Sequence, residues 1–456
     1  MNTPILAIDI GSTKICAIIG EVKDGSVDIS GHGIVKSQGI KKGTITNIQL
    51  ASKAIKHSVD DAKRVAGLNI SLANISMSGA YTKSINATGV VNIPSGEISI
   101  TEINRVMQTA LYNANIPNEF EILHVLPYKF KIDEQDFIDD PNGMNANRME
   151  VDVHIIMTAK SNLGNLKKAV NAAGIEINKV VLSGYASSIA VISESDKVRG
   201  VAVIDMGGET SNLILHVGNS IQYNDFLSVG SNHITNDLSI ALHTPLDSAE
   251  NLKITKGTLL ESESEEIELP IIGDENNMNI VSLDAAQNII YSRMEETINI
   301  LANSLAKSEL ADQLGSGIVL TGGMTKIPGT RELAQALIPS IPIRIGQPEN
   351  ILNVMDDLNV PEFSTAIGLL YYGSGKHTEY ELDGSKNMLH SKEYKPKNSL
   401  QDIAGFEDIV KPKVSVSTPS FSNEEENDLF KDLSKEPKKD QNNPLQNFVQ
   451  WASKIF

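Results

Sequence analysis

The sequence predicts a mixed α/β protein built from two related lobes. Apolar runs alternate with polar, helix-compatible stretches from Met1 to about Gly375, which is typical of strands that alternate with helices. A pattern of strand, acidic residue, glycine-containing turn and strand occurs twice, once near the start of the chain and once near its middle. The chain has 456 residues, which is too long for one ordinary domain. Two related halves that face each other account for these observations.

The composition of the chain disfavours some classes of function. The formal net charge is −18, and a surface this acidic disfavours nucleic-acid binding, which needs clustered Lys and Arg to neutralise phosphates. Cys16 is the single cysteine and stands in an apolar run, so we expect a small core residue and no internal disulfide. No run approaches the roughly 18 apolar residues of a transmembrane helix, and residues 1–4 carry no sign of a signal peptide. We therefore expect a soluble, cytoplasmic body.

The repeated pattern places one acidic residue at the bend of each of two expected hairpins. In the first hairpin, Asp9 precedes a turn that joins the apolar runs 6–10 and 15–19. In the second hairpin, Asp205 has the same position before a turn with two glycines. We interpret the repetition as the mark of a duplicated fold.

These two turns are candidate phosphate-binding elements. A turn of glycine and small hydroxyl residues exposes several backbone N–H groups, which suit phosphate oxygens. The residues expected to face phosphates are Gly11, Ser12, Thr13, Lys14, Gly207, Gly208 and Thr210. Asp9 and Asp205 would repel phosphate unless a cation lies between them, so they are candidates to hold Mg²⁺ through water. A single Asp-x-Gly hairpin is also ordinary turn chemistry, but the matched pair favours function.

Two further elements are candidates for contact with a base and a ribose. An apolar strand ends at Gly322, Gly323 and Met324, where backbone without side chains permits a flat ring to approach. The alternative is a plain strand-to-helix turn. Glu250 and Lys253 stand at positions i and i+3 of an expected helix, on one face. They are either contacts to ribose hydroxyls and ring nitrogens or a solvated ion pair.

The order of these elements resembles that of the actin, heat-shock chaperone and sugar kinase superfamily over residues 4–373. The resemblance implies an actin-like duplicated, two-lobed ATPase fold with ATP and Mg²⁺ as cofactors. It implies that Gly322, Gly323 and Met324 contact adenosine, with Glu250 and Lys253 on its other side. Residues 185–190 and 363–368 look like the two crossing connector helices.

Within that superfamily, the chain is similar to the FtsA family. The stretches that carry this resemblance are Gly39–Ile45, Ile234–Leu238 and Ser248–Lys253. The resemblance implies the following parts: a first lobe of residues 1–83, 160–200 and 345–375; an inserted small α+β subdomain of residues 84–159; and a second lobe of residues 201–344, with 236–305 as its smaller subdomain.

One departure from the superfamily pattern lies in the second hairpin. That hairpin usually reads Asp-x-Gly-Gly-Gly-Thr, often with Asp two residues later, but here Glu209 replaces the third glycine and Asn212 the later acid. A glutamate that faced phosphates would repel them unless it pointed away. We expect nucleotide binding with at most slow ATP hydrolysis, since no residue stands out as a base that activates water.

The end of the chain has a different character from the body. Residues 376–443 are rich in Lys, Glu, Asn, Ser and Pro, which predicts a disordered linker. Residues 444–456 predict an amphipathic helix that begins at Pro444. Its apolar face is formed by Leu445, Phe448, Val449, Trp451, Ala452, Ile455 and Phe456. A detached helix of this kind is expected to lie in a bilayer interface; docking on the body or in a protein groove is the alternative.

The FtsA resemblance implies a cell-division protein at the cytoplasmic face of the membrane. Its implied partners are the C-terminal tail of FtsZ, further copies of itself in a filament, the membrane surface and later division proteins. Arg293 and Asn236 are the implied contacts for FtsZ, although Arg293 also fits a plain helix arginine paired with Glu296. A sugar or small-molecule kinase of the same superfamily is the alternative function.

Overall fold

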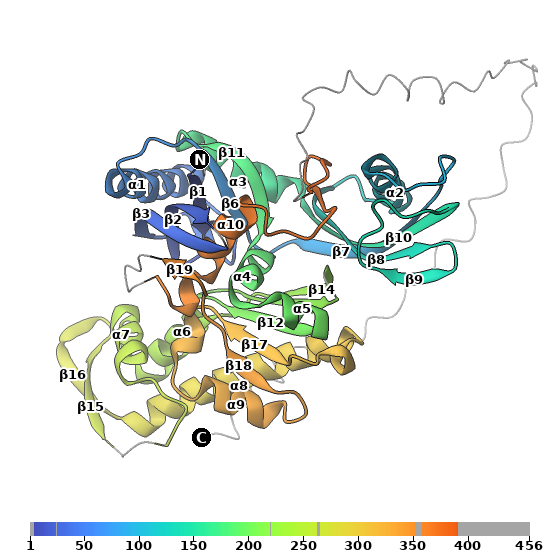
Figure 1. Cartoon of the computed structure of the whole chain (residues 1–456). Coiled ribbons are helices and arrows are strands. Elements are labelled where there is room, and N and C mark those ends of the chain that lie inside the picture. The colour runs from blue at the N-terminus through green and yellow to red at the C-terminus, as the bar shows by residue number, and fades with distance from the viewer. Residues whose placement is uncertain (1–3, 24, 219, 262–264, 353–357, 391–456) are drawn as a thin grey trace, which may run out of the picture. The chain divides into compact units, whose positions relative to one another are not determined.

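The computed structural model describes residues 4–390, apart from residues 24, 219, 262–264 and 353–357 and the side chains of 275–276. Three large sheets of five or six strands form within these residues (Figure 1). Two of the sheets belong to lobes with corresponding hairpins, and the third belongs to a subdomain inserted in the first lobe. The mixed α/β architecture with duplicated hairpins is the one that the sequence predicts.

The first lobe is built on a six-stranded sheet with the order β11-β6-β1-β2-β3-β19. Its strands are β1 (Ile5–Ile10), β2 (Lys14–Lys23), β3 (Ser26–Lys36), β6 (Leu72–Met77), β11 (Glu176–Leu182) and β19 (Ile351–Leu352). Its helices are α1 (Ile48–Ala66), α3 (Lys160–Ala172), α4 (Ser183–Val191) and α10 (Ser364–Gly373). Residues 15–20 of β2 are all buried, including Cys16 as predicted, because helices cover both faces of the sheet.

The second lobe repeats the hairpin on a five-stranded sheet with the order β14-β13-β12-β17-β18. Its strands are β12 (Val201–Met206), β13 (Ser211–Val217), β14 (Ser220–Leu227), β17 (Ile318–Thr321) and β18 (Ile343–Ile345). Around it lie α5 (Glu194–Arg199), α6 (Ser231–Leu242), α7 (Leu246–Lys256), α8 (Leu283–Lys307), α9 (Thr330–Leu337) and the hairpin β15 (Glu266–Ile271) with β16 (Asp274–Ser282). Asp9 pairs with Cys16 across the first hairpin and Asp205 with Asn212 across the second, so both predicted hairpins are confirmed.

Helices α4 and α10 cross between the two hairpins, as the sequence predicts for residues 185–190 and 363–368. A Cβ atom at Gly368 would lie 1.7 Å from the carbonyl oxygen of Ala186, so only glycine permits this crossing. Helix α10 also brings Thr365 against Asp205 of β12. The crossing therefore joins the first lobe to the base of the second hairpin.

The inserted subdomain has its own sheet and its own apolar core. Its elements are β7 (Thr82–Asn92), α2 (Ile100–Asn113), β8 (Phe120–Ile132), β9 (Gln135–Ile138) and β10 (Arg148–Ala159). Ser99 and Glu102 form a capping box that begins α2. The buried residues of α2 recur at three- and four-residue spacing (Ile103, Val106, Met107 and Ala110), so one face of the helix closes this core.

The prediction of a disordered linker from residue 376 is wrong for residues 376–390. This segment leaves α10, crosses to the inserted subdomain and forms β20 (Leu382–Asp383), which pairs with β8 (Figure 1). The polar composition of residues 376–390 did not indicate this packing, because their polar groups pair with residues far away in the sequence. The remainder of the predicted linker and the helix 444–456 lie outside the described residues.

The partners of Glu381 hold this segment in place. Its carboxylate is fully buried and accepts hydrogen bonds from the hydroxyls of Tyr185 (3.0 Å) and Tyr372 (2.8 Å) and from Nδ1 of His124 (2.6 Å). Nε2 of His124 accepts a hydrogen bond from the N–H of Leu182 (3.0 Å), which fits a neutral imidazole that donates through Nδ1. These donors come from α4, α10 and β8, so one carboxylate joins the first lobe to the inserted subdomain.

We predict that Glu381→Ala destabilises the protein strongly. The substitution leaves the buried donors of His124 and Tyr372 without their acceptor, while Tyr185 can still donate to Thr378 Oγ1, and the loss costs about 3–5 kcal/mol. Thermal unfolding of the full chain checks this, and we expect a midpoint lower by roughly 5 °C or more. Glu134→Ala, at an exposed glutamate between β8 and β9, is the control and leaves the midpoint unchanged. Equal midpoints for the two variants would contradict this role of Glu381.

Candidate functional site

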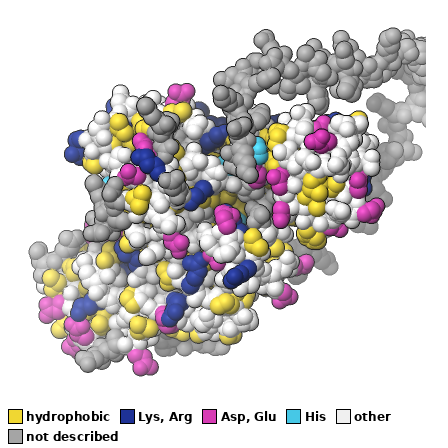
Figure 2. All heavy atoms as spheres, viewed as in Figure 1, with side chains coloured by type: hydrophobic (Ala, Val, Ile, Leu, Met, Phe, Trp, Pro, Cys, Tyr) yellow, Lys and Arg dark blue, Asp and Glu magenta, His cyan; other side chains and the backbone are white. Residues whose placement is uncertain are grey.

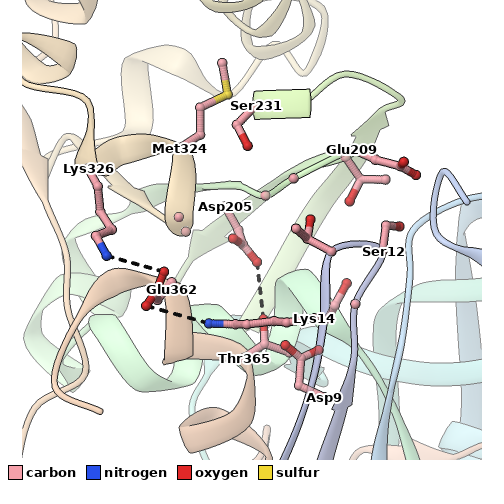
Figure 3. Close-up of a pocket in the computed structure, with 18 of the residues that line it drawn as sticks. Asp9, Ser12, Lys14, Asp205, Glu209, Ser231, Met324, Lys326, Glu362 and Thr365 are labelled. Atoms are coloured by element: carbon pink, nitrogen blue, oxygen red, sulfur yellow. Dashed lines mark hydrogen bonds and ion pairs between the residues drawn. The ribbon is translucent and has the colours of Figure 1, made fainter. Parts of the chain in front are cut away.

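The turns of the two hairpins line one cavity of about 400 Å³. All fourteen residues predicted to contact phosphate, magnesium or adenosine are among its lining residues. They are Asp9, Gly11, Ser12, Thr13, Lys14, Asp205, Gly207, Gly208, Thr210, Glu250, Lys253, Gly322, Gly323 and Met324. Residues separated by more than 300 positions in the sequence thus surround one space, and Figure 3 shows part of it.

The two turns have the same geometry and touch each other. In each turn the first glycine N–H donates to a carbonyl three residues later, from Gly11 to Lys14 O (3.1 Å) and from Gly207 to Thr210 O (2.8 Å). A Cβ atom at Gly208 would lie 1.6 Å from Oγ1 of Thr13, so the contact between the turns requires glycine.

Gly322 is constrained in a similar way at the end of β17. It has a φ of 89°, and a Cβ atom there would lie 2.5 Å from Oδ1 of Asp205. The short helix η2 (Gly323–Lys326) follows, so the chain turns sharply away beside the acid. The Gly-Gly element therefore lies against the second hairpin.

The two acidic residues lie at the base of the cavity (Figure 3). Asp9 accepts a hydrogen bond from Ser76 Oγ (2.9 Å), and Asp205 accepts one from Thr365 Oγ1 (3.4 Å). Burial raises the pKa of Asp9. Burial, with a further contribution from the charge of Asp9, raises the pKa of Asp205 to about 6. A divalent cation near both carboxylates would relieve this unfavourable burial of negative charge.

Lys14 brings a positive charge to the same place. Its Nζ lies 3.9 Å from Oε1 of Glu362 and 3.5 Å from the ring centroid of Phe363. The ammonium is buried and has no hydrogen-bond partner among the described residues, and burial lowers its pKa. A buried ammonium that has no acceptor in the wall of a cavity fits an anionic ligand such as a phosphate.

Glu250 and Lys253 form an ion pair in which the lysine is buried and the glutamate side chain is 38% exposed. The side chain of Lys253 is only 6% exposed, because α6 packs beside α7 and covers it. Its Nζ donates to Glu250 Oε2 (2.7 Å) and to Thr235 Oγ1 (2.9 Å). The pair lines the cavity together with Met324 and is already fixed in position.

Glu209 points away from Asp205, toward Ser12 at the edge of the site (Figure 3). Its Oε2 accepts a hydrogen bond from the backbone N–H of Lys42, and its Oε1 lies 3.5 Å from Nδ2 of Asn232. Asn212, the other departure from the pattern, is buried and packs against Gly79 and Gly184.

Several lining residues were not predicted from the sequence. Glu362 lies between Lys14 and Lys326, and its Oε2 is 3.5 Å from Nζ of Lys326. Ser76 contacts Asp9, and Thr365 contacts Asp205. The available signal was the connector segment 363–368, which Glu362 directly precedes and which contains Thr365. Nothing in the sequence distinguishes Ser76 from other serines.

The predicted partner-binding residues lie outside the cavity, on α6 and α8. Arg293 donates from Nε to Asp237 Oδ2 (2.6 Å) and from Nη2 to Asp237 Oδ1 (3.1 Å), and it also pairs with Glu296. Asn236, next to Asp237, is exposed. Arg293 is therefore more than a plain helix arginine with one partner, because it also joins α8 to α6.

Two family models match the chain. The model described as "Cell division protein FtsA" matches residues 202–368, which include the second hairpin and the Gly-Gly element. The model described as "SHS2 domain inserted in FTSA" matches residues 79–157, which form most of the inserted subdomain.

The chain is similar to curated relatives over most of its length. It is 41% identical over 418 residues to the cell division protein FtsA of Helicobacter pylori (strain J99), with 84% of each chain covered. It is 35% identical to that of Borreliella burgdorferi, covering 87% of this chain and 96% of the relative. It is 31% identical to the cell division protein FtsA of Escherichia coli (strain K12), covering 85% of this chain and 94% of the relative.

Solved structures of low sequence identity share the fold. A chain of the PilM–PilN type IV pilus biogenesis complex has a TM-score of 0.59 and 16% identity, over 82% of this chain and 99% of that chain. MreB5 of Spiroplasma citri bound to ADP has a TM-score of 0.51 and 13% identity, over 82% of this chain and 97% of that chain. These likenesses confirm the predicted actin-like fold.

The burial of Asp205 leads to a prediction about the protein without ligand. A pKa of about 6, against 3.8 for the free side chain, means that the ionised carboxylate costs about 3 kcal/mol of folding free energy at pH 7. This cost is fully present above pH 6 and disappears as the pH falls below about 4, because the folded state then gains the proton. Asp205→Asn therefore raises the thermal midpoint at pH 7 and has little effect near pH 4.

Thermal unfolding of the ligand-free chain between pH 4 and pH 8 measures this difference. Asp312→Asn, at an exposed aspartate, is the control. A midpoint for Asp205→Asn that stays at or below that of the unaltered chain at pH 7 would show that the carboxylate is well solvated.

Proposed function

Because the chain belongs to the FtsA family of cell division proteins, we propose that it binds ATP and Mg²⁺ in the cavity between its hairpins. We also propose that it forms filaments and anchors FtsZ filaments to the cytoplasmic membrane at the division site. The observation that carries the nucleotide proposal is the ammonium of Lys14, which is buried without a hydrogen-bond partner beside two carboxylates whose pKa values burial raises. An anion with a bound divalent cation satisfies both kinds of charge at once, and a nucleotide with Mg²⁺ is such a ligand.

The lining residues divide into two groups that suit the two parts of a nucleotide. The backbone of both hairpin turns and Lys14 would hold the phosphates, and Asp9 and Asp205 would hold Mg²⁺ through water. Among the described residues, no group of three or more His, Cys, Asp or Glu side chains is arranged to bind a metal directly, so phosphate and water would complete the coordination. Glu250 and Lys253, opposite Gly322–Met324, would hold the adenosine.

The carboxylates of the cavity favour slow turnover over a kinase reaction. The five that line it, in the part of the chain that the structure describes, all have a partner: Asp9 with Ser76, Asp205 with Thr365, Glu209 with Lys42, Glu250 with Lys253, and Glu362 with Lys14 and Lys326. In this proposal Asp9 and Asp205 hold Mg²⁺ and the other three carboxylates are held by their partners, so none is left to accept a proton from a sugar substrate. The paired state of these groups supports a nucleotide-dependent structural role with at most slow hydrolysis.

The smaller subdomain of the second lobe is the proposed docking surface for the FtsZ tail. Asn236 and Ile240 lie four residues apart on α6, on one exposed face, and Ile240 is 74% exposed. Further exposed apolar side chains, such as Met278 and Ile280, lie on the neighbouring β16, in the part of the molecule at the lower left of Figure 2. Exposed apolar side chains on neighbouring elements favour a protein partner. Later division proteins would bind elsewhere, with the inserted subdomain as the proposed site.

The membrane contact is proposed for the helix 444–456, which lies outside the described residues. In the part of the chain that the structure describes, no helix combines the length and the apolar character needed to cross a bilayer. The proposal for the last residues rests on the apolar face that the sequence predicts, which includes Trp451, the single tryptophan of the chain.

We predict that Lys14→Ala weakens ATP binding at least about tenfold in the presence of Mg²⁺, the effect of losing one charge-assisted contact. Titration calorimetry of the full chain measures the affinity. Lys53→Ala, at an exposed lysine of α1, is the matched control and keeps the affinity of the unaltered chain. If ATP does not bind to the unaltered chain, or binds equally to all three proteins, the nucleotide site is misassigned.

For the membrane proposal, we predict that the full chain sediments with liposomes and that a chain ending at Asn443 does not. Mg·ATP should increase the bound fraction, because copies in a filament bind through many weak helices together. Trp451→Glu should reduce sedimentation, whereas Gln450→Glu, on the polar face of the predicted helix, should not. Equal sedimentation of the full and shortened chains would exclude the last residues as an anchor.

A further inference from the structure

Glu209 links the second hairpin to a turn of the first lobe. This turn joins β4 (Ile40–Lys41) to β5 (Thr44–Ile45) and has Lys42 and Gly43 at its tip. The N–H of Lys42 donates to Oε2 of Glu209, across the boundary between the lobes. Nδ2 of Asn232, at the start of α6, lies 3.5 Å from Oε1 of the same carboxylate. The glutamate is thus oriented from its own lobe toward the turn.

The same turn also contacts the first hairpin. The N–H of Gly43 donates to Oγ of Ser12 (2.8 Å), so two consecutive N–H groups of one turn reach both candidate phosphate hairpins. Lys42 has a φ of 48° and Gly43 a φ of 76°, the pair of left-handed conformations found in a tight two-residue hairpin turn. A Cβ atom at Gly43 would lie 2.0 Å from Oγ of Ser78, so the turn is held closely against the end of β6.

We propose that Glu209 is a latch between the lobes that slows the release of bound nucleotide. Gly43, Ser12 and Glu209 all line the cavity on the side where the two phosphate turns meet. When the carboxylate holds the N–H of Lys42, the turn covers this side of the cavity. Glu209 is a positioning residue in this role, since it acts through the turn. The proposal rests on the proposed nucleotide function of the same cavity.

Charge repulsion predicts the opposite effect on nucleotide release. A glutamate near phosphates would speed release, because like charges repel. Repulsion predicts that removal of the carboxylate slows nucleotide release, whereas a latch predicts that removal speeds it. The two mechanisms therefore differ in the sign of one measured rate.

The test is the dissociation rate of a fluorescent ATP analogue from the full chain with Mg²⁺, measured by stopped flow after mixing with excess ATP. We expect Glu209→Gly to release the analogue roughly ten times faster, the loss of one charge-assisted hydrogen bond. Glu209→Gln keeps an acceptor oxygen and should restore most of the slow rate. Lys42→Gly keeps the N–H and suits the positive φ, so it should release the analogue at nearly the unaltered rate.

Three outcomes would overturn the latch: an unchanged or slower release from Glu209→Gly, no rescue by Glu209→Gln, or a release from Lys42→Gly as fast as from Glu209→Gly. The last result would assign the effect to the lysine charge. If the unaltered chain does not bind the analogue, the proposed nucleotide function fails. Hydrogen exchange at residues 42–43 of the ligand-free chain then tests the contact alone. Faster exchange in Glu209→Gly supports the contact, and equal exchange contradicts it.

Discussion

Two turns from different lobes touch at Gly208 and Thr13, and a Cβ atom at Gly208 would lie 1.6 Å from the threonine hydroxyl. This contact places Asp9 and Asp205 near each other below the turns, where burial and their mutual repulsion raise the pKa of Asp205. The protein thus keeps two carboxylates and one ammonium in a cavity, where the burial of each charge costs free energy as long as no ligand is bound. Such a site gains free energy when it binds an anion together with a divalent cation, and this couples the arrangement of the lobes to the ligand.

The elements around the turns keep this arrangement in place. Helices α4 and α10 cross at Gly368, and Thr365 of α10 donates a hydrogen bond to Asp205. The β4–β5 turn contacts Ser12 in one lobe and Glu209 in the other. Farther from the cavity, the buried carboxylate of Glu381 joins the inserted subdomain to the first lobe. Polar contacts of this kind are specific in direction, so they define how the parts meet more sharply than apolar packing alone.

Much of the site could be predicted from the sequence because its main parts are local. Each hairpin is a continuous stretch whose strands, acid and glycines are adjacent, and the duplication makes the pair recognisable. The burial of Glu381 could not be predicted, because its donors Tyr185 and His124 lie about 200 positions or more away in the sequence and its neighbours are polar. The direction of Glu209 depends on a backbone N–H of another lobe, and any residue type at position 42 except proline would provide that group.

A nucleotide that bridges both hairpins is the central claim, and hydrogen–deuterium exchange of the full chain with and without Mg·ATP tests it most directly. The predicted result is joint protection of residues 11–14, 207–210 and 322–324 when the nucleotide is saturating. Protection of the turn in one lobe alone, or of neither turn, would contradict a site shared by the two lobes.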